Sequence, residues 1–264
     1  MSTVHQSAAK GYQSAADKYQ RGRPDYAPQV FTWLRDKLGA EPNSIVVDLG
    51  AGTGKFTKRI CDISEHVIAV DPVDAMREKL AADLPQVEVI KGTADKMPLD
   101  DDSVDILVCS QSFHWFASSA AVAEIHRILK PGGRFGLVWN VRDERTDWVA
   151  ELTKIITPYE GDAPRYYKGD WREPFPAPGF GLLEETRFVN AHIGTPEDVI
   201  FNRFMSVILK EITLTNFKNY TLAILTGFII GSLNKIWPWK ETLTWRTNSH
   251  GIEVPLNQQS VSPF

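Results

Sequence analysis

Residues 46–60, "VVDLGAGTGKFTKRI", place an apolar run directly before a glycine-rich turn and a basic, helix-like run. Gly50, Gly52 and Gly54 fall on the turn, where glycine lets the backbone bend tightly and lets a ligand approach without a Cβ in the way. In a parallel sheet, a strand-to-helix turn of this kind lies at the carboxyl ends of the strands, where ligands bind. The stretch therefore predicts a buried strand followed by a ligand-binding loop.

The spacing of the glycines argues against the two common nucleotide-phosphate sites. A dinucleotide site needs the pattern G-x-G-x-x-G, and Lys55 stands where the third glycine should be. A P-loop needs Ser or Thr after its Gly-Lys pair, and Phe56 occupies that position. We therefore expect a ligand that is held without a pyrophosphate or a magnesium-bound triphosphate.

Strand-like and helix-like segments alternate on both sides of this loop. Short β-branched and apolar runs predict strands, and longer segments with helical periodicity predict the helices between them. This alternation indicates an α/β fold, with a Rossmann-like, mostly parallel sheet and helices on both faces. The expected strands are 44–50, 66–71, 86–92, 103–110, 133–140 and 182–193, and the expected helices are 7–20, 27–38, 55–61, 74–84 and 118–130.

Two acidic residues stand where an adenosine would be recognised. Asp71 ends the second expected strand, where a carboxylate accepts hydrogen bonds from both ribose hydroxyls. Asp95 follows the third strand and is suited to receive the exocyclic amine of an adenine, with Met97 and Leu99 as apolar neighbours. An acidic surface turn is the alternative explanation of Asp95. Together the two carboxylates indicate a ligand with an adenosine half and a carboxylate-bearing half.

Four motifs in order resemble those of class I S-adenosylmethionine-dependent methyltransferases across residues 7–200. They are "VVDLGAGTGKFT", "VIAVD", "GTADKMPLDDDSVD" and "ILKPGGRF". The segments "YQRGRPDY", "SQSFHWF" and "VWNVRD" are similar to the small-molecule branch of trans-aconitate methyltransferase-like proteins. The resemblance implies S-adenosyl-L-methionine as the cofactor. It places the cofactor against Asp48, Gly50, Ala51, Gly52, Asp71, Ala94 and Asp95, with Gln111 on the methionine side.

The segment after the fourth strand, "QSFHWF", is where this family brings its acceptor to the methyl group. His114 is a candidate general base, because the ordinary pKa of histidine is ~6.5. The alternative is that His114 and Trp115 only form a wall of the pocket. A carboxylate acceptor needs no base, and the Asn/Asp-Pro-Pro-aromatic stretch expected of adenine or amide N-methylation is absent from this sequence.

Further acceptor contacts are expected from an N-terminal lid and from the end of the fifth strand. Tyr19 and Tyr26 are candidates to cover the sulfonium, because aromatic faces attract cations. Arg23 and Arg142 are candidates to bind an acceptor carboxylate bidentately. The competing interpretations are a simple turn between helices for the first segment, and an ion pair of Arg142 with Asp143 or Glu144.

From Phe201 the sequence stops resembling a methyltransferase. Residues 219–234, "NYTLAILTGFIIGSLN", carry no charge and contain a G-x-x-x-G pattern typical of packed membrane helices. The run is nevertheless shorter than the ~20 apolar residues that span a bilayer. Residues 227–256 resemble the end of a prokaryotic polytopic membrane family implicated in polyprenyl-phosphate recycling. Either this tail is an unusually apolar part of the fold, or it is a foreign fragment that leaves the closing strands of the sheet missing or replaced.

The composition gives the remaining expectations. A net charge of −4 gives no basic footprint for nucleic acid. The two cysteines lie far apart, which favours neither a metal site nor a disulfide and suits a cytoplasmic protein.

We expect a monomer or weak dimer, with a lid at 1–40, a cofactor domain at 41–200 and an atypical segment at 201–264. The predicted function is methyl transfer to an oxygen or carboxylate of a small molecule. The alternative is a protein that binds the cofactor without turnover.

Overall fold

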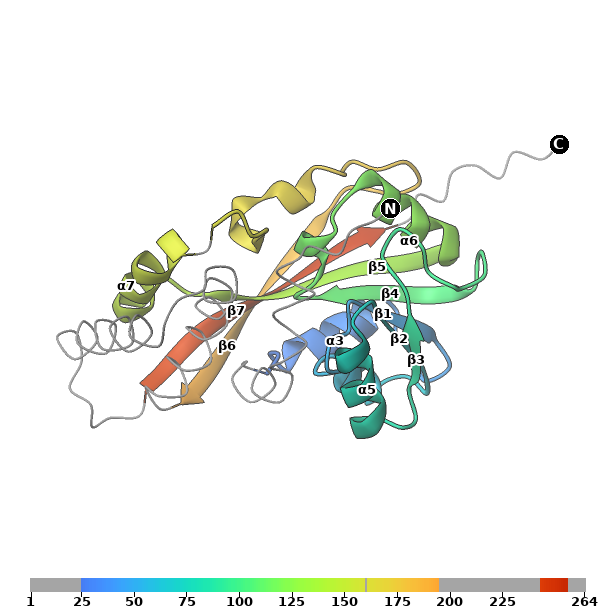
Figure 1. The fold of residues 1–264 in the computed structure, drawn as a ribbon, viewed down its shortest axis with the longest axis horizontal. Coiled ribbons are helices and arrows are strands. Elements are labelled where there is room, and N and C mark those ends of the chain that lie inside the picture. The colour runs from blue at the N-terminus through green and yellow to red at the C-terminus, as the bar shows by residue number, and fades with distance from the viewer. Residues whose placement is uncertain (1–24, 160, 195–242, 256–264) are drawn as a thin grey trace, which may run out of the picture.

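The computed structural model describes residues 25–159, 161–194 and 243–255, which form one seven-stranded sheet with flanking helices (Figure 1). Five strands are parallel in the order β3 (Glu88–Lys91), β2 (His66–Asp71), β1 (Ile45–Leu49), β4 (Val104–Ser110) and β5 (Leu129–Arg142). Two antiparallel strands, β7 (Leu243–Pro255) and then β6 (Glu184–Gly194), continue the sheet beyond β5. The predicted α/β, Rossmann-like fold is confirmed.

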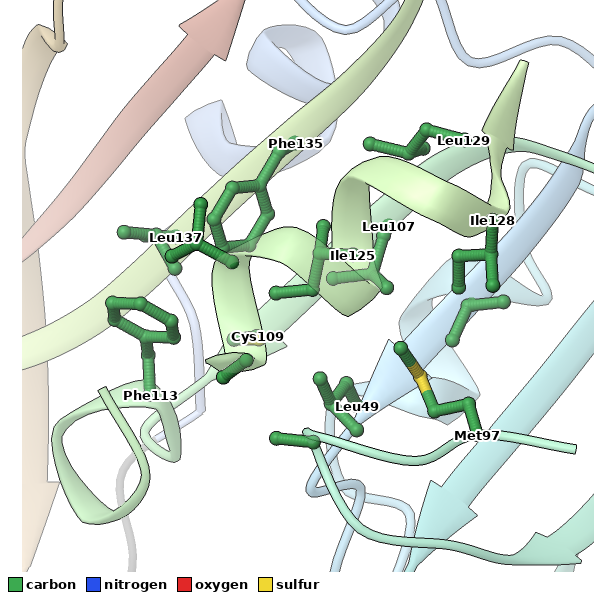
Figure 2. Close-up of a cluster of buried hydrophobic side chains, with 14 of the residues drawn as sticks. Leu49, Met97, Leu107, Cys109, Phe113, Ile125, Ile128, Leu129, Phe135 and Leu137 are labelled. Carbon is green, nitrogen blue, oxygen red and sulfur yellow. The ribbon is translucent and has the colours of Figure 1, made fainter. Parts of the chain in front are cut away.

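Alternation along each strand divides the core into two apolar layers, because successive side chains of a strand point to opposite faces. Leu107 of β4 packs in the layer that contains helix α6 (Ser119–Ile128), while its neighbour Ile106 packs in the other. Figure 2 shows Ile125 and Ile128 of α6 lying against Leu107 and Leu129. The opposite layer contains buried residues of α3 (Gln29–Asp36) and α5 (Asp74–Asp83). Both faces of the parallel sheet are therefore covered.

The helix after the glycine loop is shorter than predicted. The sequence favours a helix from the loop to Cys61, but α4 spans only Thr57–Ile60. Gly50, Gly52 and Gly54 all have positive φ angles, so the chain enters the helical region only after the loop is complete. Because the helix is short, residues 50–56 form a long loop of turns at the end of β1.

Strand β5 also differs from its prediction, which began after the Pro-Gly-Gly turn at 131–133. The observed strand runs from Leu129 to Arg142 without a break. The stretch Leu129–Arg134 lies opposite the shorter stretch Val104–Ile106 of β4, so the turn residues form a bulge. Helix α7 (Asp147–Ile156) and the short 3-10 turns η1 (Phe113–Trp115), η2 (Thr157–Tyr159), η3 (Tyr166–Lys168) and η4 (Asp170–Arg172) complete the described elements.

The C-terminal strand β7 is an internal strand of the sheet, between β5 and the edge strand β6. It pairs with β5 from Arg134↔Pro255 to Arg142↔Thr247. On its other side it pairs with β6 from Glu184↔Glu253 to Gly194↔Leu243. The closing strands are therefore present, and one of them comes from the segment that sequence analysis treated as foreign.

The described part of the expected lid belongs to the body of the fold. Trp33 and Leu34 of α3 are buried in the same apolar layer as Val46 and Ile106 of the sheet. Residues 1–24 lie outside the described residues, so a lid over the site remains a prediction for that part. The uncharged stretch 219–234 also lies outside them. In the part of the chain that the structure describes, no helix has the length and hydropathy to cross a membrane.

Candidate cofactor and acceptor site

The glycine loop closes over the carboxyl ends of β1 and β2. The Gly50 N–H donates to the Val70 carbonyl at 2.8 Å, and the Ser112 hydroxyl donates to the Leu49 carbonyl at 2.8 Å. A Cβ on Gly50 would lie 2.6 Å from the Cβ of Ser112, whereas a Cβ on Gly52 would meet no atom within 4 Å. The backbone at Gly50 is therefore packed from behind, and the space beside Gly52 is open.

Asp71 ties this loop to the end of β2. Its Oδ2 accepts the Gly52 N–H at 2.9 Å, and its Oδ1 accepts the Val73 N–H at 2.8 Å. The side chain is nearly buried, and this burial raises its pKa, while the two backbone hydrogen bonds oppose that change. Each carboxylate oxygen has a second lone pair. Asp71 is therefore fixed in orientation and can still accept hydrogen bonds from a ligand.

Asp48 lies behind the loop as a fully buried carboxyl group. Its Oδ2 accepts the Thr57 hydroxyl at 2.7 Å, and its Oδ1 has no hydrogen-bond partner among the described residues. Burial raises the pKa of Asp48 to about 7; the Thr57 hydrogen bond opposes this, and the charge of Asp71 adds to it. A carboxyl group in this state is neutral below that pH and charged above it.

The raised pKa of Asp48 predicts a pH-dependent stability. The folded-state pKa of about 7 lies above the ordinary 3.8, so between these values the folded protein binds more protons than the unfolded chain. The contribution of this group to stability is therefore lost as the pH rises from about 4 to about 7. We expect Asp48→Asn to flatten this slope and to raise the free energy of unfolding at pH 8 by on the order of 2–4 kcal/mol.

Urea unfolding of wild type and variant at pH 5 and pH 8 measures both effects. Asp74→Asn is the matched control, because Asp74 is an exposed carboxylate whose pKa is lowered by its hydrogen bond to Arg77 and then by Lys91. That control should keep the wild-type slope between pH 5 and pH 8. An Asp48→Asn protein with the wild-type slope would contradict the assignment.

The loop that carries Asp95 is held by two residues of α6. The Met97 N–H donates to Glu124 Oε1 at 2.7 Å, and Arg127 donates to the carbonyls of Leu99 and Met97 at 2.9 and 3.2 Å. Arg127 also binds Glu124 through its Nε at 2.8 Å. Ala94 is buried beside α6, which leaves the half-buried Asp95 at the end of β3 as predicted from the strand order. Sequence reasoning missed Glu124 and Arg127, although their i, i+3 spacing before "ILKPGG" was visible.

Gln111 follows β4 in a left-handed conformation, with φ +54°, which is uncommon for a residue with a side chain. Its N–H donates to the Val138 carbonyl at 2.9 Å, and its Nε2 donates to the Asn140 carbonyl at 3.2 Å. Gln111 therefore lies between the ends of β4 and β5, beside the glycine loop. Its place on the methionine side of the cofactor remains a prediction.

Tyr26 is part of the packing beside the loop. Its ring contacts Phe56 edge-on at 4.7 Å, and its hydroxyl shares a hydrogen bond with the Ser110 hydroxyl. The Asp25 carbonyl just before it accepts hydrogen bonds from Asn140 at 3.3 Å and Asn190 at 2.6 Å. Asp25 and Tyr26 are thus hydrogen-bonded to β4, β5 and β6. The other two predicted lid residues, Tyr19 and Arg23, lie outside the described residues.

An aromatic cluster lies beside Gln111, where sequence analysis expects the acceptor to bind. His114 and Trp115 lie on η1, directly after Gln111. The Trp139 Nε1–H of β5 donates to His114 Nδ1 at 3.1 Å, and the guanidinium of Arg165 lies 5.9 Å from the centre of the Trp115 ring. Sequence reasoning missed Trp139 and Arg165. Trp139 lies within the quoted "VWNVRD". Arg165 lies in a later segment, and no pattern of neighbouring residues in the sequence connects it with this region.

Arg142 ends β5 on the same edge of the sheet and is half-buried. Asp143, one of the two partners considered for it, forms a bidentate ion pair with Arg145. The Arg145 Nε and Nη2 donate to the two carboxylate oxygens at 2.7 and 2.6 Å. The role of Arg142 toward an acceptor remains a prediction.

Comparison with known proteins identifies the main part of the chain. A model of the methyltransferase domain matches residues 47–137. The uncharacterized methyltransferase-like protein C25B8.10 of Schizosaccharomyces pombe is 40% identical over 193 residues, which cover 72% of this chain and 75% of that protein. The solved structure of YcgJ from Bacillus subtilis matches with a TM-score of 0.56 at 17% identity, over 88% of this chain and 100% of that one, and shares the fold.

The Rossmann-like fold with its glycine loop defines a class I methyltransferase architecture. The chain belongs to the methyltransferase family represented by these relatives. It is an S-adenosylmethionine-dependent methyltransferase, and S-adenosylmethionine is its cofactor.

The C-terminal segment matches a second family. A model described as undecaprenyl phosphate translocase-like matches residues 199–254. The polyprenyl-phosphate transporter of Vibrio cholerae is 57% identical over 64 residues, which cover 24% of this chain and 19% of the transporter. The matched residues include nearly all of β7. The predicted resemblance of the tail is confirmed, and the same residues supply a strand to the methyltransferase sheet.

Proposed function

We propose that this enzyme methylates an oxygen of a small-molecule acceptor, specifically a carboxylate, in the cytoplasm. The observation that carries the proposal is the guanidinium of Arg165 over Trp115, beside His114 on the acceptor side. A guanidinium recognises a carboxylate, and the surrounding rings suit an apolar or unsaturated carbon frame. Acids of the trans-aconitate kind, the expectation from "SQSFHWF" and "VWNVRD", meet this description.

We infer that the cofactor contacts the residues that sequence analysis named, and the geometry of the glycine loop supports this inference. The space beside Gly52 is open, and the carboxylate of Asp71 is fixed in orientation. Together they suit a ribose whose two hydroxyls donate hydrogen bonds to Asp71. Asp95 would receive the adenine amine, and Gln111 would lie along the methionine part. When bound, S-adenosylmethionine supplies an electrophilic methyl group on a sulfonium, and the protein supplies alignment and electrostatics.

A second candidate is a protein that holds the cofactor without turnover. The match of residues 199–254 to a transporter family favours it, because that segment resembles a family other than the methyltransferases. The two candidates share the cofactor site and differ only in whether an acceptor is methylated.

A transfer assay separates them. The full chain is incubated with methyl-labelled S-adenosylmethionine and a panel of di- and tricarboxylic acids, each paired with its amide and its alcohol analogue. We expect alkali-labile label, characteristic of a methyl ester, with an acid and not with its matched analogues. Label on the alcohols would contradict the carboxylate proposal. No transfer by a protein that binds the cofactor in titration calorimetry would favour the second candidate.

A further inference from the structure

His114 stands at the acceptor side with one of its ring nitrogens already engaged. The Trp139 indole Nε1 lies 3.1 Å from His114 Nδ1. An indole nitrogen is a donor only, so Nδ1 must be the acceptor in this hydrogen bond. In a neutral imidazole one nitrogen accepts and the other carries the proton. The neutral ring of His114 therefore holds its proton on Nε2.

The donor is fixed by its surroundings and cannot turn away from His114. Trp139 is 1% exposed, and its ring packs against Trp171 at 4.7 Å and Tyr166 at 5.0 Å between ring centres. Trp171 is itself held, because its indole N–H donates to the Tyr166 carbonyl at 3.0 Å. A proton on His114 Nδ1 would face the Nε1–H of Trp139 and leave that buried donor without an acceptor, which proteins avoid.

This arrangement is unsuited to general-base catalysis. A base must present a lone pair to the proton that it removes. The lone pair of His114 points to Trp139, and the other nitrogen carries hydrogen and can only donate. His114 therefore does not activate the acceptor, which favours an acceptor oxygen that is already nucleophilic when it binds.

We propose that His114 is a positioning residue that donates an Nε2–H hydrogen bond to an anionic acceptor oxygen, with Trp139 fixing its tautomer. The inference rests on the proposed function and narrows its substrate class to carboxylates that are already ionised. The acceptor oxygen forms the new C–O bond while the C–S bond breaks and its electron pair stays on sulfur. The products are a neutral ester and a neutral thioether, and no proton has to leave.

Nitrogen NMR of the full chain tests the tautomer without any acceptor. Two-bond spectra of ¹⁵N-histidine-labelled protein at about pH 8, above the ordinary pKa of ~6.5, distinguish a protonated from an unprotonated ring nitrogen. The His114 signals are assigned by their loss in His114→Gln. We expect an unprotonated Nδ1 and a protonated Nε2 in wild type, and a mixture of both tautomers in Trp139→Phe. A protonated Nδ1 in wild type, or a single Nε2–H tautomer that persists in Trp139→Phe, would overturn the inference.

Kinetics with an acid found in the transfer assay test the role. His114→Gln keeps an N–H donor but has no basic nitrogen, and His114→Leu keeps similar bulk without a donor. We expect kcat of the Gln variant within about tenfold of wild type, and a KM for the acid raised about tenfold or more in the Leu variant. A general base would instead cost both variants ~10²–10⁴-fold in kcat. Absence of any methylated acid would count against the proposed function while the NMR result stands.

Discussion

Asp71→Ala should weaken the binding of S-adenosylmethionine by about 10²–10⁴-fold. The carboxylate lies at the end of β2 with both oxygens oriented by backbone N–H groups of Gly52 and Val73. Two charge-assisted hydrogen bonds to ribose hydroxyls would each contribute about 1.5–3 kcal/mol. Their loss is larger than the effect expected for any other single side chain in the proposed site. Titration calorimetry with the cofactor measures it directly.

The control for this prediction is Asp74→Ala. It removes the same charge three residues away, at an exposed carboxylate that forms ion pairs with Arg77 and Lys91. We expect that variant to bind the cofactor within about threefold of wild type, because exposed ion pairs are worth little. Equal affinity of Asp71→Ala and wild type would refute the proposed ribose contact. Thermal unfolding of both variants without cofactor shows whether the glycine loop depends on Asp71 for its own structure.

Truncation of the chain after Thr242 should abolish cooperative unfolding. β7 lies between β5 and β6, so its removal leaves both without their antiparallel partner and exposes the long edge of β5. An unpaired edge of this length promotes aggregation. We expect loss of a sharp thermal transition and growth of large particles in light scattering. Truncation after Pro255 retains all of β7 and is the matched control.

A point substitution in β7 tests the contribution of this strand separately from that of the rest of the tail. Ile252 lies opposite Leu137 of β5 and Glu185 of β6. Proline at this position cannot donate to the ladder and is excluded from central strands. We expect Ile252→Pro to lower the thermal midpoint by about 10 °C. Wild-type stability of this variant, or of the protein truncated after Thr242, would show that residues 243–255 do not form part of the sheet.

The tail therefore has two properties that sequence analysis treated as alternatives. Residues 199–254 match a transporter family, yet β7 within them completes the methyltransferase sheet. Strand pairing through backbone hydrogen bonds makes few demands on side chains, so a segment of another origin can serve as a strand. This also explains why deletion of the tail should destabilise the fold and should not improve the solubility of the protein.

The site was predictable wherever its residues follow the ends of parallel strands. Gly50 and Gln111 come directly after a strand that the pattern of apolar residues indicated, and Asp71 ends such a strand. The fold brings those strand ends to one edge. Trp139 was less predictable, because its indole meets His114 only through packing against Tyr166 and Trp171 from a separate segment. The spacing of residues along the chain contains no information on that contact.

The amino-acid sequence by itself determined the class of the enzyme and its cofactor. The class follows from four motifs in order that resemble those of class I methyltransferases, and the glycine spacing and the carboxylates at strand ends are local features that a parallel sheet aligns. The tertiary structure alone decided two things: that β7 closes the sheet, and which nitrogen of His114 faces Trp139. Both depend on residues distant in the chain, whose meeting is set by the packing of the whole sheet and not by any local pattern.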